Sequence, residues 1–177
     1  MEIALQAFGR EDFERLIGWA SSREFLLQWA GPIFEFPLDD LQLERYLAAA
    51  VETPPARRIF RAVAGGEVVG HIELDAIDGR NGSGRMARVL IKDAWRNRGA
   101  GCAMVRALLE FAFGELGLHR VDLVVFDFNR AAIACYEKAG FVREGHIREA
   151  RRMGDSYWSL YQMSMLRDEW RRRAEAR

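Results

Sequence analysis

A glycine-containing turn is the segment whose residue types and spacing indicate chemistry most directly. Residues 96–101 read Arg-Asn-Arg-Gly-Ala-Gly and lie between a predicted strand and a predicted amphipathic helix. Such a turn exposes consecutive backbone N–H groups at a helix N-terminus, where the helix macrodipole also favours negative charge. Gly99 and Gly101 allow a ligand to approach the backbone closely, and Arg96 and Arg98 can donate charge-assisted hydrogen bonds. The turn therefore predicts a cradle for a phosphate or pyrophosphate group.

The glycine turn has other possible interpretations besides a phosphate cradle. A strand-to-helix turn can contain glycine only because glycine adopts unusual backbone angles, and the hexapeptide alone leaves that interpretation open. The turn is not a Walker loop, because Gly101 is followed by Cys102 and Ala103 instead of Gly-Lys-Ser/Thr. A third glycine at the spacing of a dinucleotide fingerprint is also missing. By itself, the turn indicates phosphate and no particular ligand.

A second motif follows an apolar predicted strand at residues 121–126. Residues 129–141 read Asn-Arg-Ala-Ala-Ile-Ala-Cys-Tyr-Glu-Lys-Ala-Gly-Phe. With this motif, the segment 88–141 closely resembles the GNAT family of N-acetyltransferases. The family's first motif, Arg/Gln-x-x-Gly-x-Gly/Ala, matches Arg96, Gly99 and Gly101. Its second motif matches Asn129, Ala132, Tyr136, Lys138, Gly140 and Phe141. Both motifs stand in the family's order, with a helix and a strand between them.

The resemblance implies an enzyme that transfers the acetyl group of acetyl-CoA to a primary amine, such as a protein N-terminus, an amino acid or a small amine, by direct attack on the thioester. The amides of the glycine turn would hold the coenzyme A pyrophosphate. The strand before the turn would pair with the pantetheine arm and polarise the acetyl carbonyl, and Asn129 would hydrogen-bond the arm. The residues that the resemblance assigns to cofactor binding are Val89, Leu90, Ile91, Arg96, Arg98, Gly99, Ala100, Gly101, Cys102 and Asn129.

Tyr136 is, by the same resemblance, the general acid that protonates the departing thiolate. A thiol has a pKa near 8.5 and a phenol a pKa of around 10, so the phenol can donate this proton with modest assistance. The alternative is an aromatic side chain that only packs in the core. Cys135 is interpreted as a packing thiol, because no paired histidine is evident nearby in the sequence. Cys102 stands at a helix N-terminus, which could lower its pKa, and packing is its default interpretation.

The group that accepts the proton of the attacking amine is less clear. Many relatives place a glutamate five residues before the asparagine motif, where this sequence has Val124. Glu73 and Asp127 are substitutes, although for each an ordinary solvated or paired carboxylate competes with a catalytic role. A water relay is the remaining option. The missing glutamate also keeps a second hypothesis open, namely a non-catalytic acyl-CoA-binding or regulatory module on the same fold.

The acceptor pocket is expected in an aromatic stretch at residues 25–37, where the family builds it. The candidate pocket residues are Trp29, Phe34 and Phe36, which could instead cap the core. The acids near them, Glu35, Asp39 and Asp40, are too few to indicate a polycationic acceptor. The tail at residues 157–170 and the N-terminal half resemble, more loosely, the branch that contains the ribosomal-protein-alanine acetyltransferases.

Hydrophobic periodicity predicts the elements that position these residues. Strands are expected at residues 3–8, 58–64, 67–75, 85–91, 121–126, 141–147 and 157–166. Helices are expected at residues 11–20, 38–51, 99–115 and 129–139, with a polar helix at the C-terminal end and a stop at residues 53–55 after the second helix. We therefore expect one α/β (α+β) domain over residues 1–177, a GNAT-like mixed sheet flanked by helices, with the cofactor-binding core at about residues 85–141.

Composition excludes several other classes. Lys and Arg number 26 and so do Asp and Glu, which gives no support for nucleic-acid binding, and the Arg171–Arg173 run is interpreted as a solvated helix end. Two cysteines and three scattered histidines make a metal site improbable. No apolar run of 18 residues and no basic leader are present, so a cytoplasmic protein without a membrane segment is expected. A homodimer is left open.

Overall fold

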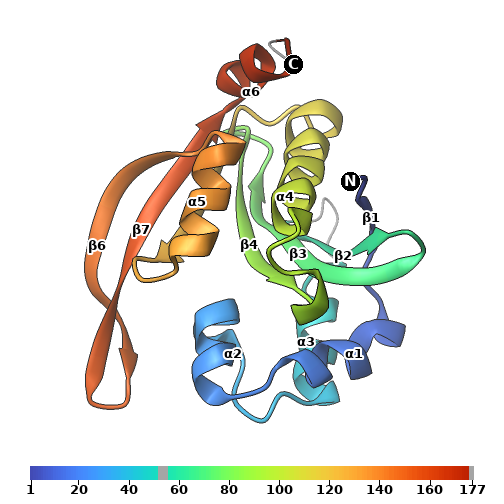
Figure 1. Ribbon diagram of the computed structural model, residues 1–177, viewed down its shortest axis with the longest axis vertical. Coiled ribbons are helices and arrows are strands. Elements are labelled where there is room, and N and C mark those ends of the chain that lie inside the picture. The colour runs from blue at the N-terminus through green and yellow to red at the C-terminus, as the bar shows by residue number, and fades with distance from the viewer. Residues whose placement is uncertain (52–55, 176–177) are drawn as a thin grey trace.

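The computed structural model describes residues 1–51 and 56–175, and within them the chain forms a seven-stranded sheet. The strands are β1 (Ala4–Ala7), β2 (Arg58–Ala64), β3 (Glu67–Asp78), β4 (Ser83–Ile91), β5 (Arg120–Phe126), β6 (Val142–Met153) and β7 (Ser156–Leu166). The α-helices are α1 (Phe13–Trp19), α2 (Arg23–Ala30), α3 (Asp40–Ala48), α4 (Ala100–Glu110), α5 (Arg130–Ala139) and α6 (Arg167–Glu175). Helices α4 and α5 lie over the sheet, while α1, α2 and α3 gather at one end of the molecule (Figure 1).

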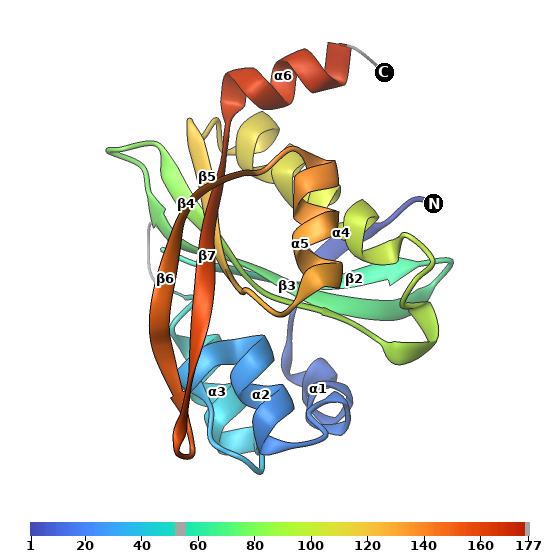
Figure 2. The same cartoon turned by 60° about the vertical axis from the view of Figure 1, so that its left-hand side comes forward.

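The predicted mixed sheet flanked by helices is confirmed. Its strand order is β1-β2-β3-β4-β5-β7-β6, in which β4 and β5 are parallel and the other neighbours are antiparallel. The predicted helix at residues 99–115 is α4 followed by a π-helical turn, Phe111–Glu115. The hairpin of β6 and β7 is longer than expected and extends to the end of the molecule where α2 and α3 lie (Figure 2). The predicted stop at residues 53–55 lies outside the described residues.

Helix α2 was not expected, because glycine and proline interrupt the aromatic stretch that contains it. Its N-terminus is formed by Ser22, whose hydroxyl oxygen accepts a hydrogen bond from the N–H of Phe25 at 3.1 Å. Gly31 ends the helix with a positive φ of 67°. The serine cap is the sequence signal that could have predicted this helix.

The sheet opens between β4 and β5. These strands are paired only at Ser83–Arg120, Gly84–Val121 and Arg85–Asp122. Beyond these pairs β4 runs on to Ile91 and β5 to Phe126 without pairing to each other. Each strand remains paired on its other side, β4 with β3 and β5 with β7. The sheet is therefore divided into two parts that meet only where both strands begin.

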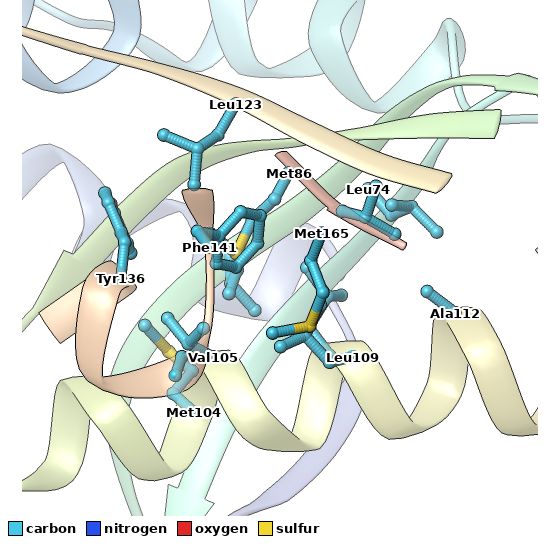
Figure 3. Close-up of a cluster of buried hydrophobic side chains, with 14 of the residues drawn as sticks. Leu74, Met86, Met104, Val105, Leu109, Ala112, Leu123, Tyr136, Phe141 and Met165 are labelled. Carbon is cyan, nitrogen blue, oxygen red and sulfur yellow. The ribbon is translucent and has the colours of Figure 1, made fainter. Parts of the chain in front are cut away.

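Two hydrophobic clusters hold the fold around this division. In the larger one, Met104, Val105 and Leu109 of α4 pack against sheet residues that include Leu74 and Met165 (Figure 3). In the smaller one, side chains of α1, α2 and α3 pack with Phe8, Ile59 and Leu90. Each fully buried side chain of this size stabilises the fold by about 1.5–3 kcal/mol. Both clusters pack on the strands that border the opening and so keep its walls in place.

Candidate active site

A cavity of about 980 Å³ occupies the space between the separated strands. Residues 85–91 of β4 and 123–126 of β5 form its walls, and the lining also includes residues of α2, β3, α4, α5, β6 and β7. This volume is at the upper end of the range found for small-molecule sites. The cavity is therefore large enough for an extended cofactor together with a second, smaller substrate.

The wall formed by β4 carries an exposed backbone edge. Val89, Leu90 and Ile91, which are predicted from the sequence to bind a cofactor, line the cavity. A β-bulge places Arg88 and Val89 opposite the single residue Ile72 of β3. Arg88 has a φ of 50°, a backbone conformation that is uncommon for a residue with a side chain and concentrates at functional sites. Since β5 has separated from β4, the backbone groups on this edge can pair with a ligand.

The glycine turn lies at the end of the same wall. Gly99 has a φ of 83° and is the N-cap of α4, where it provides no side chain to satisfy the helix end. The first helical hydrogen bond runs from the N–H of Ala103 to the carbonyl of Gly99 at 3.0 Å. The N–H groups of residues 100–102 precede it and have no intrahelical acceptor. This is the arrangement that binds a phosphate or pyrophosphate at a helix N-terminus.

The predicted turn residues differ in what they present to the cavity. Arg96, Gly99, Gly101 and Cys102 line it. The side chain of Arg98 is exposed and that of Ala100 is buried, and neither belongs to the lining. The roles of these two residues in binding a ligand stay predictions.

Helix α5 brings the second motif to the opposite side of the cavity. The side chain of Asn129 caps this helix by accepting a hydrogen bond from the N–H of Ala132 at 3.3 Å, and it also lines the cavity. Tyr136 lines the cavity about two turns of helix beyond Asn129 and is only 7% exposed. Burial raises the pKa of its phenol above the ordinary value, and the neighbouring thiols of Cys135 and Cys102 raise it further. Tyr136 is therefore protonated at neutral pH.

Cys102 and Cys135 meet across the junction of α4 and α5. Their Sγ atoms lie 2.6 Å apart, and both residues are free cysteines that line the cavity. Burial, followed by the contact with Cys102, raises the pKa of Cys135. A thiol that stays protonated is a poor nucleophile, so this geometry favours packing over catalysis.

A buried ionic cluster, formed by Tyr46, Arg57, Glu73 and Arg88, lies behind the β4 wall. Glu73 is 0% exposed, and its two carboxylate oxygens lie 2.7 Å from Arg57 Nε and 2.8 Å from Arg88 Nη1. The hydroxyl of Tyr46 donates to the same carboxylate at 2.5 Å. Burial raises the pKa of Glu73, while Arg88 opposes that effect. Glu73 is thus surrounded by its partners and does not line the cavity.

Two further groups border this ionic cluster. His71 Nε2 lies 3.1 Å from the Tyr46 hydroxyl, and burial together with the charge of Arg88 lowers the pKa of His71 to about 3. Asp75 lines the cavity and lies 3.0 Å from Arg57 Nε. Burial alone would raise the pKa of Asp75, but the hydrogen bonds from Arg57 and from the N–H of Ala76 lower it overall. Asp75 is therefore ionised and paired.

The predicted acceptor-pocket residues and the residues considered for the general base lie at different positions relative to the cavity. Trp29 lines the cavity, Phe34 stacks behind it with ring centroids 5.9 Å apart, and Phe36 lies at the surface with 39% of its area exposed. Val124 lines the cavity and is 38% exposed, at the position where many relatives have glutamate. Asp127 lies outside the lining and is 2.9 Å from His146 Nε2.

Sequence reasoning missed three members of the ionic cluster. Tyr46, Arg57 and Arg88 come from different parts of the chain and belong to no motif. Among the residues described, no group of three or more side chains is arranged to hold a metal ion. The same residues include no helix both long and apolar enough to cross a bilayer.

Comparison with known proteins gives related enzymes. A family model, the acetyltransferase (GNAT) family, matches residues 9–141. The spermidine N(1)-acetyltransferase of Vibrio cholerae is 25% identical over 175 residues, which cover 98% of each chain. Its crystal structure in complex with CoA and spermine has a TM-score of 0.83 and covers 96% of this chain and 98% of that one.

Two shorter matches name other acceptors. The L-amino acid N-acetyltransferase of Escherichia coli K12 is 31% identical over 64% of this chain and 70% of its own length. A ribosomal N-acetyltransferase-like protein of Bacillus subtilis is 30% identical over 59% of this chain and 57% of its own length. Together with the spermidine enzyme, these matches confirm the predicted class of enzyme, an N-acetyltransferase that uses coenzyme A. The chain belongs to the acetyltransferase (GNAT) family, as residues 88–141 predicted.

Proposed function

We propose that this protein transfers the acetyl group of acetyl-CoA to a primary amine by direct attack of the amine on the thioester. The observation that carries the proposal is the cavity between β4 and β5, where three features meet. These are a helix N-terminus without a side-chain cap, an unpaired strand edge and the protonated phenol of Tyr136. Each feature suits one part of a coenzyme A thioester.

The proposed binding mode follows from these features. The N–H groups of residues 100–102 receive the pyrophosphate, because a helix N-terminus attracts negative charge. The edge at residues 89–91 pairs with the amides of the pantetheine arm as a neighbouring strand would. Asn129, already fixed as a helix cap, hydrogen-bonds the arm from the other side of the cavity.

The proposed chemistry needs a fixed donor for the carbonyl and an acid for the leaving thiolate. Backbone N–H groups beside the β4 bulge stabilise the negative charge that develops on the thioester oxygen, and the strand holds them in position before the reaction begins. Tyr136 donates its proton to the departing sulfur. Burial that raises the pKa of the phenol also raises that of a thiol in the same cavity, so the two groups remain matched.

The proton of the amine leaves by a different route. Within residues 1–51 and 56–175, Asp75 is the one carboxylate in the cavity lining. It is paired with Arg57 and has a lowered pKa, which makes it a weak base. We therefore infer that the amine reacts in its neutral form and that water in the open cavity accepts its proton. The rate should then rise with pH toward the pKa of the free amine.

The test of this function is cofactor binding followed by release of thiol. Titration with acetyl-CoA is expected to give a Kd in the micromolar range or tighter, and a suitable amine is expected to release free CoA. Spermidine is the first acceptor to try because the full-length relative is named for it. Absence of any thermal shift at millimolar acetyl-CoA would refute the proposal. Binding without thiol release over a broad panel of amines would favour the non-catalytic module.

A further inference from the structure

The charges that line the cavity bear on which amine it accepts. Among the residues that the structure describes, Asp75 is the one acidic residue in the lining, and it is paired with Arg57 and Arg88. The cationic residues of the lining are Arg85, Arg88, Arg96, Lys138 and Arg151. A polyamine acetylated at one end needs carboxylates to bind its other ammonium groups. The lining provides no carboxylate for that purpose.

Four of these five cationic side chains are accounted for by an ion pair or by a position beside the cofactor site. Arg85 lies 2.6 Å from Asp122, Arg88 is held by Glu73, and Arg96 lies 2.9 Å from Asp93 beside the glycine turn. Lys138 belongs to α5, and its charge acts to lower the pKa of the Cys135 thiol, which places it on the cofactor side. Arg151 differs from all four because it enters the cavity from the β6–β7 hairpin.

Arg151 is partly buried and has no acidic partner within the described residues 1–51 and 56–175. The polar contact found for its guanidinium is a hydrogen bond from Nη1 to the carbonyl of the neighbouring Ala150 at 2.8 Å. A guanidinium in a partly buried cavity retains unused donors that suit a carboxylate in a two-pronged geometry. The side chain is therefore available to an anionic ligand.

A distortion of β6 positions this arginine. Ile147 pairs with Leu160 and Arg151 pairs with Trp158, so three residues of β6 lie opposite one residue of β7. Glu149, at a φ of 51°, donates its N–H to Ser159 Oγ at 3.0 Å and fixes this bulge. Bulges beside active sites commonly change the direction of a side chain.

The hairpin is also anchored beside the cavity. Trp158, opposite Arg151, packs edge-on against Phe126 at the end of β5, with ring centroids 5.1 Å apart. Phe126 and Leu160 line the cavity with Phe25, Trp29 and Ile33 of the α2 region. This part of the lining is apolar apart from Gln28 and Arg151, and the guanidinium of Arg96 lies over the ring of Phe25, 6.0 Å from its centroid.

From this arrangement we propose that the acceptor is an amine that carries its own carboxylate and an apolar side chain, as an apolar amino acid does, and that Arg151 binds the carboxylate. This proposal rests on the proposed acetyl transfer and names its substrate class. The apolar wall receives the side chain, the guanidinium holds the carboxylate, and the amine is left to face the thioester. A polycation is disfavoured by the same charge.

The experiment compares matched acceptors in a thiol-release assay with the full chain. Leucine and phenylalanine are measured beside leucinamide and phenylalaninamide, beside isoamylamine and phenethylamine, and beside spermidine. Because the amine reacts in its neutral form and the ammonium groups of these acceptors differ in acidity, kcat/KM is expressed per concentration of neutral amine. On that scale the free amino acids are expected to have values at least about tenfold above those of the amides, since a charge-assisted hydrogen bond is lost in the amide.

Variants separate this role from cofactor binding. Arg151→Gln is expected to lower kcat/KM for leucine by about 10- to 100-fold. The kcat/KM for leucinamide and the Kd for acetyl-CoA should stay within twofold of the values of the unaltered protein. Arg151→Glu is expected to shift the preference toward spermidine. The matched control is Arg148→Gln, an exposed arginine of the same strand outside the cavity lining, which should change none of these values.

Each contrary result has a distinct meaning. Equal or better turnover of isoamylamine or spermidine by the unaltered protein would overturn the substrate class and leave acetyl transfer intact. An equal loss for leucine and leucinamide in Arg151→Gln, or a weakened acetyl-CoA Kd, would overturn the role of Arg151. Failure to bind acetyl-CoA would instead refute the proposed function itself.

Discussion

The two sides of the cavity are built in different ways. On the cofactor side, short contiguous segments supply backbone groups, namely the turn before α4 and the edge of β4, together with Asn129 and Tyr136 of α5. On the acceptor side, single side chains of α3, β3 and β4, together with Arg57, form the buried ionic cluster behind the β4 wall. Backbone sites tolerate changes of side chain, whereas a cluster of paired charges does not. Loss of the Tyr136 phenol should therefore act on catalysis, and changes in the ionic cluster should act first on stability.

Removing Glu73 should give the largest effect. Glu73→Ala leaves Arg88, which is 8% exposed, without its principal partner, and the loss of one member of a buried ion pair typically costs about 3–5 kcal/mol. Chemical denaturation is expected to show a loss of that size. The matched control is Glu67→Ala on the same strand, which removes an exposed pair with Lys92 and should change little. Lost turnover at full stability would give Glu73 a direct part in the reaction.

Removing the phenol of Tyr136 tests the cofactor side. Tyr136→Phe is expected to lower kcat by about 100-fold, because general acid catalysis typically contributes at least that factor. The Kd for acetyl-CoA should stay within twofold, since the aromatic ring is kept. Tyr161→Phe, on β7 and outside the lining, serves as the control and should change neither kcat nor the Kd for acetyl-CoA. Unchanged turnover in Tyr136→Phe would exclude the acid role.

The pH dependence of stability tests the acceptor side again. His71 has a folded pKa of about 3, below its ordinary value of 6.5, so as the pH falls below 6.5 the unfolded chain takes up a proton that the folded chain does not. The stability that this histidine contributes is present above pH 6.5 and is lost between pH 6.5 and 3. From pH 7 to pH 5 the loss should be about 2 kcal/mol.

The comparison for this pH effect uses two variants. His71→Asn should remove that part of the slope in denaturation experiments, while His119→Gln, which replaces an exposed histidine, should keep it. Equal slopes in all three proteins would mean that the pKa of His71 is the same in the folded and the unfolded chain.

The glycine turn should give the smallest effect. Gly99→Ala places a side chain at a φ of 83°, where open space exists but the left-handed backbone costs about 1–2 kcal/mol. Thermal or chemical denaturation should show a loss of that order. Gly18→Ala in α1, which also meets open space but has no positive φ, should instead stabilise by about 0.5–1 kcal/mol. A stabilised Gly99→Ala would show that the turn does not need this conformation.

The same contrast explains what sequence could predict. The glycine turn and the asparagine motif are local patterns, and the elements that carry them were found where expected. The ionic cluster was not found, because Tyr46 and Arg88 have no pattern that relates them to Glu73. The opening of the sheet was hidden too. The strand at residues 121–126 is almost entirely apolar and so resembles one covered on both faces, whereas Val124 of that strand lines the cavity.

The short pairing of β4 with β5 has a consequence for how the protein holds together. Only three residue pairs join the two parts of the sheet, so a ligand lying along residues 89–91 takes the place of missing strand contacts. Such a ligand joins the two parts of the sheet reversibly, and its binding free energy adds to the cooperativity of folding. At a ligand concentration 100 times its Kd the added stability is about 2.7 kcal/mol. Amide hydrogens along this edge should then exchange far more slowly in the complex than in the free chain.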